Sequence, residues 1–276
     1  MKHPRSVIFR IAEKIGKHSG EGIANFFKPI NRKLLRTFSE LTFPFQSDVF
    51  TARVNGTSTS YFVKDPQELT TLRWNFIYEK KVRDGVLTSL REEDVFYDVG
   101  ANLGTYSLPV AQKLGEGAIY AFEPFRKNMD RLKENAELNG LEINLFPLAL
   151  SDTNGTAEME VFSDRPGETK NRLSRGRTGR KTVKVETRRC DDLIEERGLD
   201  KPDVVKIDVE GAELEVLRGM EESLENCRLI YCEVHKEGLE ERKSSREELL
   251  KLLHDYGFDL GVIHRRGGDL EIKGEK

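Results

Sequence analysis

From Asp94 to Val262 the sequence alternates between short apolar runs and longer amphipathic stretches, and this alternation restricts the fold more than any other feature. The amphipathic stretches predict helices at Leu103–Leu114, Phe125–Asn139, Glu210–Leu224 and Ser244–Tyr256. The apolar runs predict strands at Val95–Val99, Ala118–Phe122, Ile143–Leu150, Val204–Val209, Leu229–Val234 and Phe258–Ile263. Strands that alternate with helices in this way form a doubly wound, mostly parallel sheet, so the fold class is α/β.

A shorter segment, residues 47–93, precedes this region. Val49–Val54 and Ser58–Val63 alternate around Asn55-Gly56-Thr57, which predicts a β-hairpin. The helical pattern that follows runs from Asp65 to Leu90. We therefore divide the chain into residues 1–46, the hairpin and helix of 47–93, and a main domain at 94–276.

The first 46 residues form a basic arm. Residues 1–36 carry nine Lys and Arg but only two Glu, a local charge of +7, while the whole chain has a net charge of −3. Apolar residues recur near helical spacing, so the arm is either a helical appendage packed on the main domain or a basic amphipathic helix resting on anionic lipid. Nucleic-acid binding and disorder are weaker alternatives. A signal peptide is not expected, because charged residues interrupt the apolar stretch that it would need.

A second basic segment interrupts the main domain. Two predicted strands, Glu158–Phe162 and Thr182–Glu186, enclose a loop at 163–181 with seven cations and two acidic residues. A loop of this length inside a compact domain is unusual and is often functional. It is either a solvated hairpin tip or a lid over a substrate that bears phosphate, sulfate or carboxylate.

Composition excludes several classes of protein. A net charge of −3 argues against a polycation built for nucleic acid, and 37% hydrophobic residues argue against global disorder. No apolar stretch is long enough to span a bilayer. The three cysteines form no C-x-x-C motif and cannot all pair, which favours buried thiols in a reducing, cytoplasmic compartment, with the inner membrane face as a peripheral location.

The glycine-containing turn at Asp98–Gly104 follows the first predicted strand of the main domain. A turn between a strand and a helix directs backbone N–H groups toward a ligand in the crevice. The dinucleotide fingerprint G-x-G-x-x-G is not met, because Asn102 occupies the position of its middle glycine, and no G-K-[ST] follows. Binding of NAD or of a nucleotide triphosphate is therefore disfavoured.

Glu123 ends the next predicted strand, 23 residues after Gly100. An acidic residue at about this distance accepts hydrogen bonds from ribose hydroxyls in nucleoside sites. Together with the turn, Glu123 indicates adenosine without a pyrophosphate.

Six ordered motifs extend this interpretation: DVGANLGTYSL (98–108), AFEP (121–124), LNG (138–140), ALSD (149–152), KIDVEGAELEVLRGM (206–220) and CEVH (232–235). The set resembles the FkbM family of S-adenosylmethionine-dependent class I methyltransferases over about 94–262. The resemblance implies a Rossmann-like fold, S-adenosylmethionine as cofactor and a hydroxyl group as methyl acceptor.

The resemblance also assigns cofactor-binding roles. It places Asp98, Gly100, Ala101, Asn102 and Gly104 under the methionine part of the cofactor. It places Glu123 on the ribose hydroxyls, and Ser151 and Asp152 beside the adenine. Pro109 departs from the small or aliphatic residue usual in such helices, and in a helix that begins near Leu103 it would cause a kink.

Methyl transfer to an alcohol needs alignment of the reactants and a general base. The candidates follow the fourth and fifth predicted strands: Asp208, Glu210, Glu233 and His235. Residues two apart share a face of a strand. His235 is the favoured base because its ordinary pKa is about 6.5.

Other roles stay open for these residues. His235 could be structural, and Asp208 could cap a helix, with Lys206 as its ion-pair partner. The four residue types also suit a divalent ion, but their spacing matches no dedicated motif, so we predict no metal. Trp74 and Tyr78, four residues apart, are better explained as packing than as an aromatic platform.

The sequence thus predicts a methyltransferase that acts on a hydroxyl of a glycan, glycolipid or other small-molecule alcohol. The basic loop and residues 1–36 favour an anionic or membrane-borne acceptor. Two alternatives remain: a nucleic-acid methyltransferase, although no N-P-P-Y motif follows the fourth strand, and a non-catalytic, membrane-associated module that binds S-adenosylmethionine.

Overall fold

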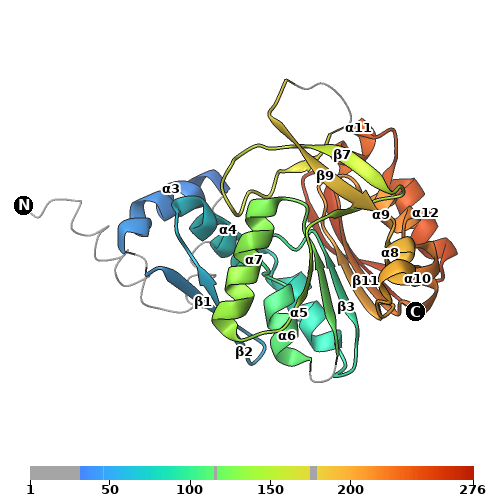
Figure 1. Cartoon of the computed structure of the whole chain (residues 1–276), viewed down its shortest axis with the longest axis horizontal. Coiled ribbons are helices and arrows are strands. Elements are labelled where there is room, and N and C mark those ends of the chain that lie inside the picture. The colour runs from blue at the N-terminus through green and yellow to red at the C-terminus, as the bar shows by residue number, and fades with distance from the viewer. Residues whose placement is uncertain (1–31, 46, 115–116, 175–178) are drawn as a thin grey trace, which may run out of the picture.

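The computed structural model of the chain describes residues 32–45, 47–114, 117–174 and 179–276. Its centre is a seven-stranded sheet in the order β12-β13-β11-β10-β3-β4-β5 (Figure 1). The strands are β3 (Phe96–Val99), β4 (Ile119–Phe122), β5 (Asn144–Phe146), β10 (Val204–Ile207), β11 (Leu229–Val234), β12 (Asp259–Arg266) and β13 (Asp269–Glu275). The predicted doubly wound sheet is confirmed: β5, β4, β3, β10 and β11 are parallel, and only β13 runs antiparallel to its neighbours.

The chain order reverses at the centre of this sheet. After β3 the chain builds outward through β4 and β5, and it then returns to place β10 on the other side of β3. Val99 pairs with Phe122 on one side and with Ile207 on the other, so the three strands end at the same level. A ligand crevice forms where the order reverses, outside the carboxyl ends of the strands.

Helices cover both faces of the sheet. Side chains alternate along β3, so that Tyr97 and Val99 pack with α8 (Cys190–Arg197), α9 (Glu213–Arg218), α10 (Glu221–Asn226) and α12 (Arg246–Asp255). Phe96 packs on the opposite face against α5 (Lys80–Ser89) and α6 (Ser107–Lys113), beside α7 (Arg126–Asn139). The remaining helix, α11 (Lys236–Glu241), follows β11 directly.

The predicted hairpin is β1 (Val49–Val54) and β2 (Thr57–Phe62), with Asn55 and Gly56 at φ values of 46° and 83° in the turn. Two asparagines of α7 bind the free edge of β2: the side-chain oxygens of Asn135 and Asn139 accept from the amides of Phe62 and Ser60, both at 2.8 Å. The hairpin is thereby fixed to the main domain.

Of the basic arm, the structure describes α3 (Arg32–Thr42) and a 3₁₀ turn at Phe43–Phe45. Arg73 of α4 (Pro66–Tyr78) donates to the hydroxyls of Ser39 and Thr42, so α3 packs on α4. Residues 1–31, which hold most of the arm's positive charge, lie outside the described residues. Within the described ranges, no helix has both the length and the apolar character needed to cross a membrane.

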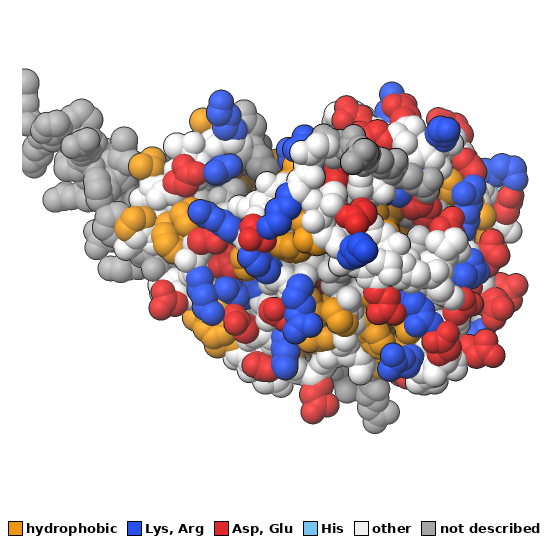
Figure 2. All heavy atoms as spheres, turned by 45° about the horizontal axis from the view of Figure 1, so that its top comes forward, with side chains coloured by type: hydrophobic (Ala, Val, Ile, Leu, Met, Phe, Trp, Pro, Cys, Tyr) orange, Lys and Arg blue, Asp and Glu red, His pale blue; other side chains and the backbone are white. Residues whose placement is uncertain are grey.

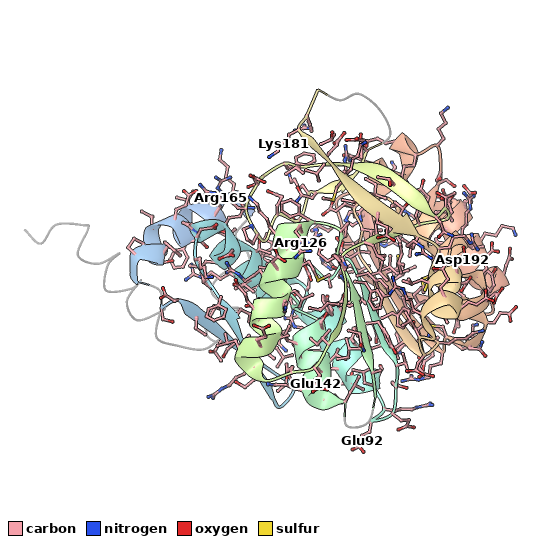
Figure 3. The ribbon with its side chains drawn as sticks, in the orientation of Figure 1. Glu92, Arg126, Glu142, Arg165, Lys181 and Asp192 are labelled. Carbon is pink, nitrogen blue, oxygen red and sulfur yellow. The ribbon has the colours of Figure 1, made fainter. Side chains whose placement is uncertain are left out.

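A second, four-stranded sheet lies over the edge of the first. Its order is β6 (Ala149–Leu150), β9 (Thr182–Arg188), β7 (Gly155–Glu160) and β8 (Arg172–Leu173). The two strands predicted around the basic loop are present as the antiparallel pair β7 and β9. Arg165 and Lys181, from the two ends of this loop, both lie on the outside of the molecule (Figure 3). Residues 175–178 are not described.

Three predicted helices have different limits in the structure. The helix expected at 103–114 begins only at Ser107, because Gly104 has a φ of 84° and ends the preceding turn. Pro109 is therefore in the first turn, where its missing N–H costs nothing, and the kink is not required. The helix expected at 210–224 breaks near Gly219, where a Cβ would lie 2.0 Å from the carbonyl oxygen of Ser151. The helix expected at 65–90 is interrupted at Glu79.

Two predicted strands also differ. The run at 143–150 is divided by Pro147 into β5 and β6, which belong to different sheets. The strand at 258–263 is longer than predicted, and the sequence analysis missed β13, which follows a turn at Gly267 and inserts between β12 and β11.

The three cysteines are free and buried, as expected. The face shown in Figure 2 mixes acidic and basic side chains among the described residues.

Candidate active site

The turn after β3 forms the floor of the crevice. Gly100 and Gly104 have φ values of 84°, and Asn102 has a φ of 50°, so three of its five residues are in the left-handed region. A Cβ on Gly100 would lie 1.9 Å from the carbonyl oxygen of Asp208, because the turn and the end of β10 are in close contact. Glycine is required at position 100 for space and for backbone conformation.

Four of the five amides of this turn are hydrogen-bonded within the protein, whereas the sequence led us to expect amides directed at a ligand. The N–H groups of Gly100 and Ala101 both donate to the carbonyl oxygen of Phe122, and that of Gly104 donates to Ala101. The N–H of Asn102 donates to Glu123 at 2.9 Å. These bonds tie the turn to β4 and fix its position at the floor of the crevice.

Glu123 is positioned by two backbone amides. Its Oε2 accepts from Asn102 and its Oε1 accepts from Phe125 at 2.8 Å, while the side chain is almost fully buried. Burial raises the pKa of Glu123 to about 7, although these hydrogen bonds and one from Asn128 oppose the rise. A carboxylate has about four acceptor positions, so Glu123 keeps capacity for a ribose diol.

Asp98, at the end of β3, is fully buried. One oxygen accepts from the Ser107 hydroxyl at 2.5 Å, and the other, 3.8 Å from the Lys206 ammonium, has no hydrogen-bond partner among the described residues. Burial raises the pKa of Asp98, and Lys206 opposes that rise. Asp98 is therefore buried beneath the turn, in contact with Ser107 and close to Lys206.

The crevice encloses about 1010 Å³, including its open mouth. It is lined by the turn, Glu123, Asp208, Glu210 and Glu233, and also by residues from the segment that leads into β8. Three polar atoms at this cleft are buried and have no hydrogen-bond partner within the described ranges: Asn102 Oδ1, Thr169 Oγ1 and Asn171 Nδ2. Such orphaned groups fit a polar ligand that completes their hydrogen bonds.

The four catalytic candidates form one cluster. His235 Nε2 lies 3.9 Å from Asp208 Oδ1 and 3.7 Å from both Glu210 Oε2 and Glu233 Oε1. Glu210 is part of this cluster, and its φ of 54° is unusual for a residue with a side chain. Such backbone strain is typical of functional sites. The predicted convergence of the strand ends is therefore present.

His235 itself lies behind the three carboxylates rather than among the cleft-lining side chains. Its Nδ1 is 2.7 Å from Glu213 Oε1, which also accepts from the amide of Gly211. Burial alone would lower the pKa of His235, but Glu213 and the neighbouring carboxylates hold it well above 6.5. The surrounding carboxylates therefore favour the protonated imidazole, and the role of His235 as the base stays a prediction.

The alternative roles for Asp208 and Lys206 are now resolved. Asp208 does not cap a helix, because α9 begins at Glu213 with Ala212 as its N-cap. Lys206 is the expected partner of Asp208, with its Nζ 3.3 Å from Asp208 Oδ2. Burial would raise the pKa of Asp208, but Lys206 and His235 lower it overall.

Ser151 and Asp152 are placed differently from the other predicted cofactor residues. They line a neighbouring depression, and the cleft is lined instead by Leu148, Ala149 and Leu150 just before them. A hydrophobic wall of this kind suits one face of an adenine ring, and the predicted role of Ser151 and Asp152 beside the adenine stays a prediction.

Sequence reasoning missed two sets of site residues. Arg266 lines the cleft from β12, pairs with Glu233 and lies 5.6 Å from the ring centre of Trp74, which also lines the cleft. Glu213 was missed because it belongs to no strand end. Trp74 also stacks on Tyr78 at 4.1 Å, so it combines packing with a position in the cleft, and the choice between packing and an aromatic platform stays open.

The segment at 163–173, called the strap below, contributes Glu168, Thr169, Asn171, Arg172 and Leu173 to the lining of the cleft. Gly167 donates to Asn128 at 2.8 Å and its carbonyl accepts from Thr71 at 2.6 Å. The carbonyl of Glu168 accepts from the Asn102 side chain at 3.3 Å. The loop that the sequence left as either a hairpin tip or a lid thus has its first half fixed to α4, α7 and the turn.

A seven-stranded sheet with one antiparallel strand, an acidic residue at the end of the second strand and a cleft at the point of reversal define a class I S-adenosylmethionine-dependent methyltransferase. Residues 98–260 match the family described as the methyltransferase FkbM domain, and the chain belongs to this family. S-adenosylmethionine is its cofactor, and the orphaned polar atoms of the cleft are consistent with a ligand of that kind.

Three relatives illustrate the range of the family. The chain is 32% identical over 226 residues to the hexuronic acid methyltransferase AglP of Haloferax volcanii, covering 79% of this chain and 89% of that protein. It is 32% identical to the methyltransferase sdnD of Sordaria araneosa, over 70% of this chain and 85% of sdnD. It is also 32% identical to the 2-O-methyltransferase NoeI of Sinorhizobium fredii, over 71% and 86%.

Proposed function

We propose that this protein transfers the methyl group of S-adenosylmethionine to a hydroxyl group of a sugar, and that the sugar carries a carboxylate or is part of a glycan or glycolipid. One observation carries the proposal: a single cleft joins the Glu123 side, suited to a nucleoside, to a side lined by carboxylates and Arg266. The names of AglP and NoeI, a hexuronic acid methyltransferase and a 2-O-methyltransferase, support this acceptor class.

The cofactor half of the site is assigned from the turn and from Glu123. We assign Glu123 to the ribose hydroxyls and the chain around Asp98–Gly104 to the methionine part. When bound, S-adenosylmethionine supplies an activated methyl group on a positively charged sulfur. The buried carboxyl of Asp98 and the carboxylate of Asp208 give this part of the cleft a negative character that favours such a charge.

The acceptor half contains the proton acceptors. A hydroxyl must lose its proton as the new carbon–oxygen bond forms, and the cleft presents Asp208, Glu210 and Glu233 for this purpose. We assign proton acceptance to these three carboxylates as a unit, because each lies within 3.9 Å of the same imidazole nitrogen. His235 and Glu213 act from behind as positioning residues.

An anionic acceptor is favoured by two arginines that line the cleft. Arg266 has 39% of its side chain exposed, and Arg172, at the strap, has 26% exposed. Both already pair with carboxylates, Arg266 with Glu233 and Arg172 with Glu160 and Glu241. A planar guanidinium has five donors, so each keeps capacity for a substrate carboxylate.

The test is methyl transfer from labelled S-adenosylmethionine by the full-length protein to matched acceptors: a glucuronide, the corresponding glucoside, and an RNA of mixed sequence. We expect label in the glucuronide, with less in the glucoside. Label in RNA alone would support the nucleic-acid alternative, and tight binding of S-adenosylhomocysteine without transfer to any acceptor would support the non-catalytic module.

We also propose that residues 1–36 hold the protein at the inner, anionic face of a membrane, which would bring the site to a lipid-linked acceptor. The part of the arm in α3 supports this, since the side chains of Leu34 and Leu41 are 56% and 61% exposed, close to Lys33 and Arg36. Flotation of the full-length protein with vesicles containing phosphatidylglycerol should exceed that with phosphatidylcholine alone, and Leu41→Ser should reduce it. Equal flotation with both vesicles would contradict the proposal.

A further inference from the structure

The environment of His235 Nε2 has a feature that hydrogen bonding does not explain. Three carboxylate oxygens surround this nitrogen at 3.7, 3.7 and 3.9 Å. Hydrogen bonds from nitrogen to oxygen have lengths of about 2.7–3.2 Å. In the part of the chain that the structure describes, Nε2 thus has charged neighbours on several sides but no hydrogen-bond partner, although 88% of the side chain is buried.

The same spacing fits atoms that share one metal ion. With metal–ligand distances of about 2.1 Å, adjacent ligands of an octahedral ion lie about 3.0 Å apart and opposite ones about 4.2 Å apart. One ligand atom each of Asp208, Glu233 and His235 lie within 4.8 Å of one another. The distances to Nε2, 3.7–3.9 Å, lie between the adjacent and the opposite value, so each oxygen would reach a ligand position by a shift of less than about 1 Å.

The orientation of each ligand is fixed from outside the cluster. Glu213 binds Nδ1 of His235, which leaves Nε2 as the nitrogen directed at the carboxylates. A carboxylate behind a histidine in this way is the usual outer partner of a metal-binding imidazole. Lys206 takes Oδ2 of Asp208 and leaves Oδ1 facing Nε2. Arg266 contacts Oε1 of Glu233, the oxygen that lies 3.7 Å from Nε2.

The local charge also favours a cation. Four carboxylates, Asp208, Glu210, Glu213 and Glu233, contact His235, whereas two permanent cations, Lys206 and Arg266, contact members of this cluster. A divalent ion reduces this excess of negative charge more than a proton on the imidazole does.

We infer that Asp208, Glu233 and His235 form a site for a divalent cation, with Glu210 close enough to join it. Two carboxylates and one imidazole suit Mg²⁺ or Mn²⁺. The role of the ion rests on the proposed function: at this edge of the cleft it would bind the acceptor hydroxyl and ease the transfer of its proton to Glu210, the cleft carboxylate that is not one of the three ligands. Glu213 is then the outer partner that orients His235.

The test uses Mn²⁺ alone as the probe of the full-length protein, without cofactor or acceptor. Electron paramagnetic resonance measures free Mn²⁺ during titration, and pulsed measurements detect coupling of the bound ion to a nitrogen nucleus. We expect one bound ion per chain with nitrogen coupling. Asp208→Asn and His235→Gln should abolish binding, and Glu213→Gln should weaken it about tenfold or more. Glu237→Gln, an exposed carboxylate close to His235 in the chain, is the matched control and should leave binding unchanged.

Binding of S-adenosylhomocysteine by each variant reports whether it is folded. The inference is wrong if folded wild-type protein leaves Mn²⁺ free at about 1 mM, a concentration that saturates even weak protein sites. It is also wrong if bound Mn²⁺ shows no nitrogen coupling, or if Asp208→Asn binds as well as the wild type. Mn²⁺ binding with no methyl transfer to any sugar would leave the ion site standing and contradict only the proposed acceptor.

Discussion

The carboxylate of Glu123, at the end of β4, accepts a hydrogen bond from the backbone N–H of Asn102, in the turn after β3, at 2.9 Å. Two parts of the chain that each bind the cofactor in our assignment are thereby joined directly. Loss of this carboxylate should affect both the ribose contact and the shape of the turn.

We therefore predict that Glu123→Ala loses affinity for S-adenosylhomocysteine. Hydrogen bonds to a charged group contribute about 1.5–3 kcal/mol, so the dissociation constant should rise roughly 10- to 150-fold. Isothermal titration calorimetry measures the change, and Glu92→Ala, an exposed glutamate remote from the cleft (Figure 3), is the control. Equal affinity in both variants would contradict the role of Glu123.

The raised pKa of Glu123 predicts a dependence of stability on pH. The pKa of Glu123 is about 7 in the folded protein, whereas its ordinary value, which applies to the unfolded chain, is 4.5. Between these pH values the folded state therefore binds more protons than the unfolded state. The free energy of unfolding should fall as pH rises through this range, by at most about 3 kcal/mol from this group. Urea unfolding at several pH values tests this, and Glu123→Gln should show a smaller fall. A slope in the variant as steep as that of the wild type would assign the effect to other groups.

Gly100 and Gly56 provide a matched pair for the contact beneath the turn. Both have φ near 84°, but a Cβ on Gly100 would meet the Asp208 carbonyl at 1.9 Å, whereas nothing lies within 4 Å of one on Gly56. Gly56→Ala should cost about 1–2 kcal/mol from backbone strain alone. Gly100→Ala should cost clearly more and also weaken cofactor binding. Similar urea midpoints for the two variants would show that the contact is not tight.

Much of the fold could be predicted from the sequence because its signals are local. Strands such as Val95–Val99 and Leu229–Val234 are short, apolar and bounded by turns, and their succession indicates a doubly wound sheet. The insertion of β13 between β11 and β12 could not be predicted, because strand order depends on packing between segments distant in sequence. The break at Gly219 has the same origin, because the Gly219 backbone must approach Ser151 closely.

The active site was predictable where it follows strand ends. Asp208, Glu210, Glu233 and His235 meet because β10 and β11 are parallel neighbours whose carboxyl ends lie together. Their protonation could not be predicted, because it depends on Glu213, which reaches His235 from the start of α9. Arg266 was missed for a similar reason, since it comes from an edge strand whose extent the sequence did not reveal.

For the acceptor side, we predict that Asp208→Asn lowers kcat by about 100-fold or more, since proton transfer contributes roughly 10²–10⁴ to such reactions. Affinity for S-adenosylhomocysteine should change little, because the amide keeps the shape of the side chain. Steady-state kinetics with the best glucuronide acceptor separates kcat from KM. Glu237→Gln, exposed on α11, should leave both constants unchanged. A rise in KM for the cofactor alone would place Asp208 in binding rather than in proton transfer.

The strap depends on a buried ion pair that joins it to the main domain. Arg242 Nη1 lies 2.6 Å from Glu215 Oε2, the side chains are 6% and 7% exposed, and the same guanidinium donates to the carbonyl oxygen of Leu173 in β8. Removal of one partner leaves a buried charge, so Glu215→Ala should cost about 3–5 kcal/mol of unfolding free energy.

The matched control for this pair is Asp255→Ala, which removes the exposed pair with Lys251 and should cost about 1 kcal/mol or less. Thermal and urea unfolding measure both changes. Because Leu173 also lines the cleft, Glu215→Ala should in addition weaken binding of S-adenosylhomocysteine, while Asp255→Ala should not. If Glu215→Ala destabilises the protein but leaves that affinity intact, the strap supports the fold without shaping the cofactor site. If affinity falls with stability, the β8 end of the strap is part of the binding surface.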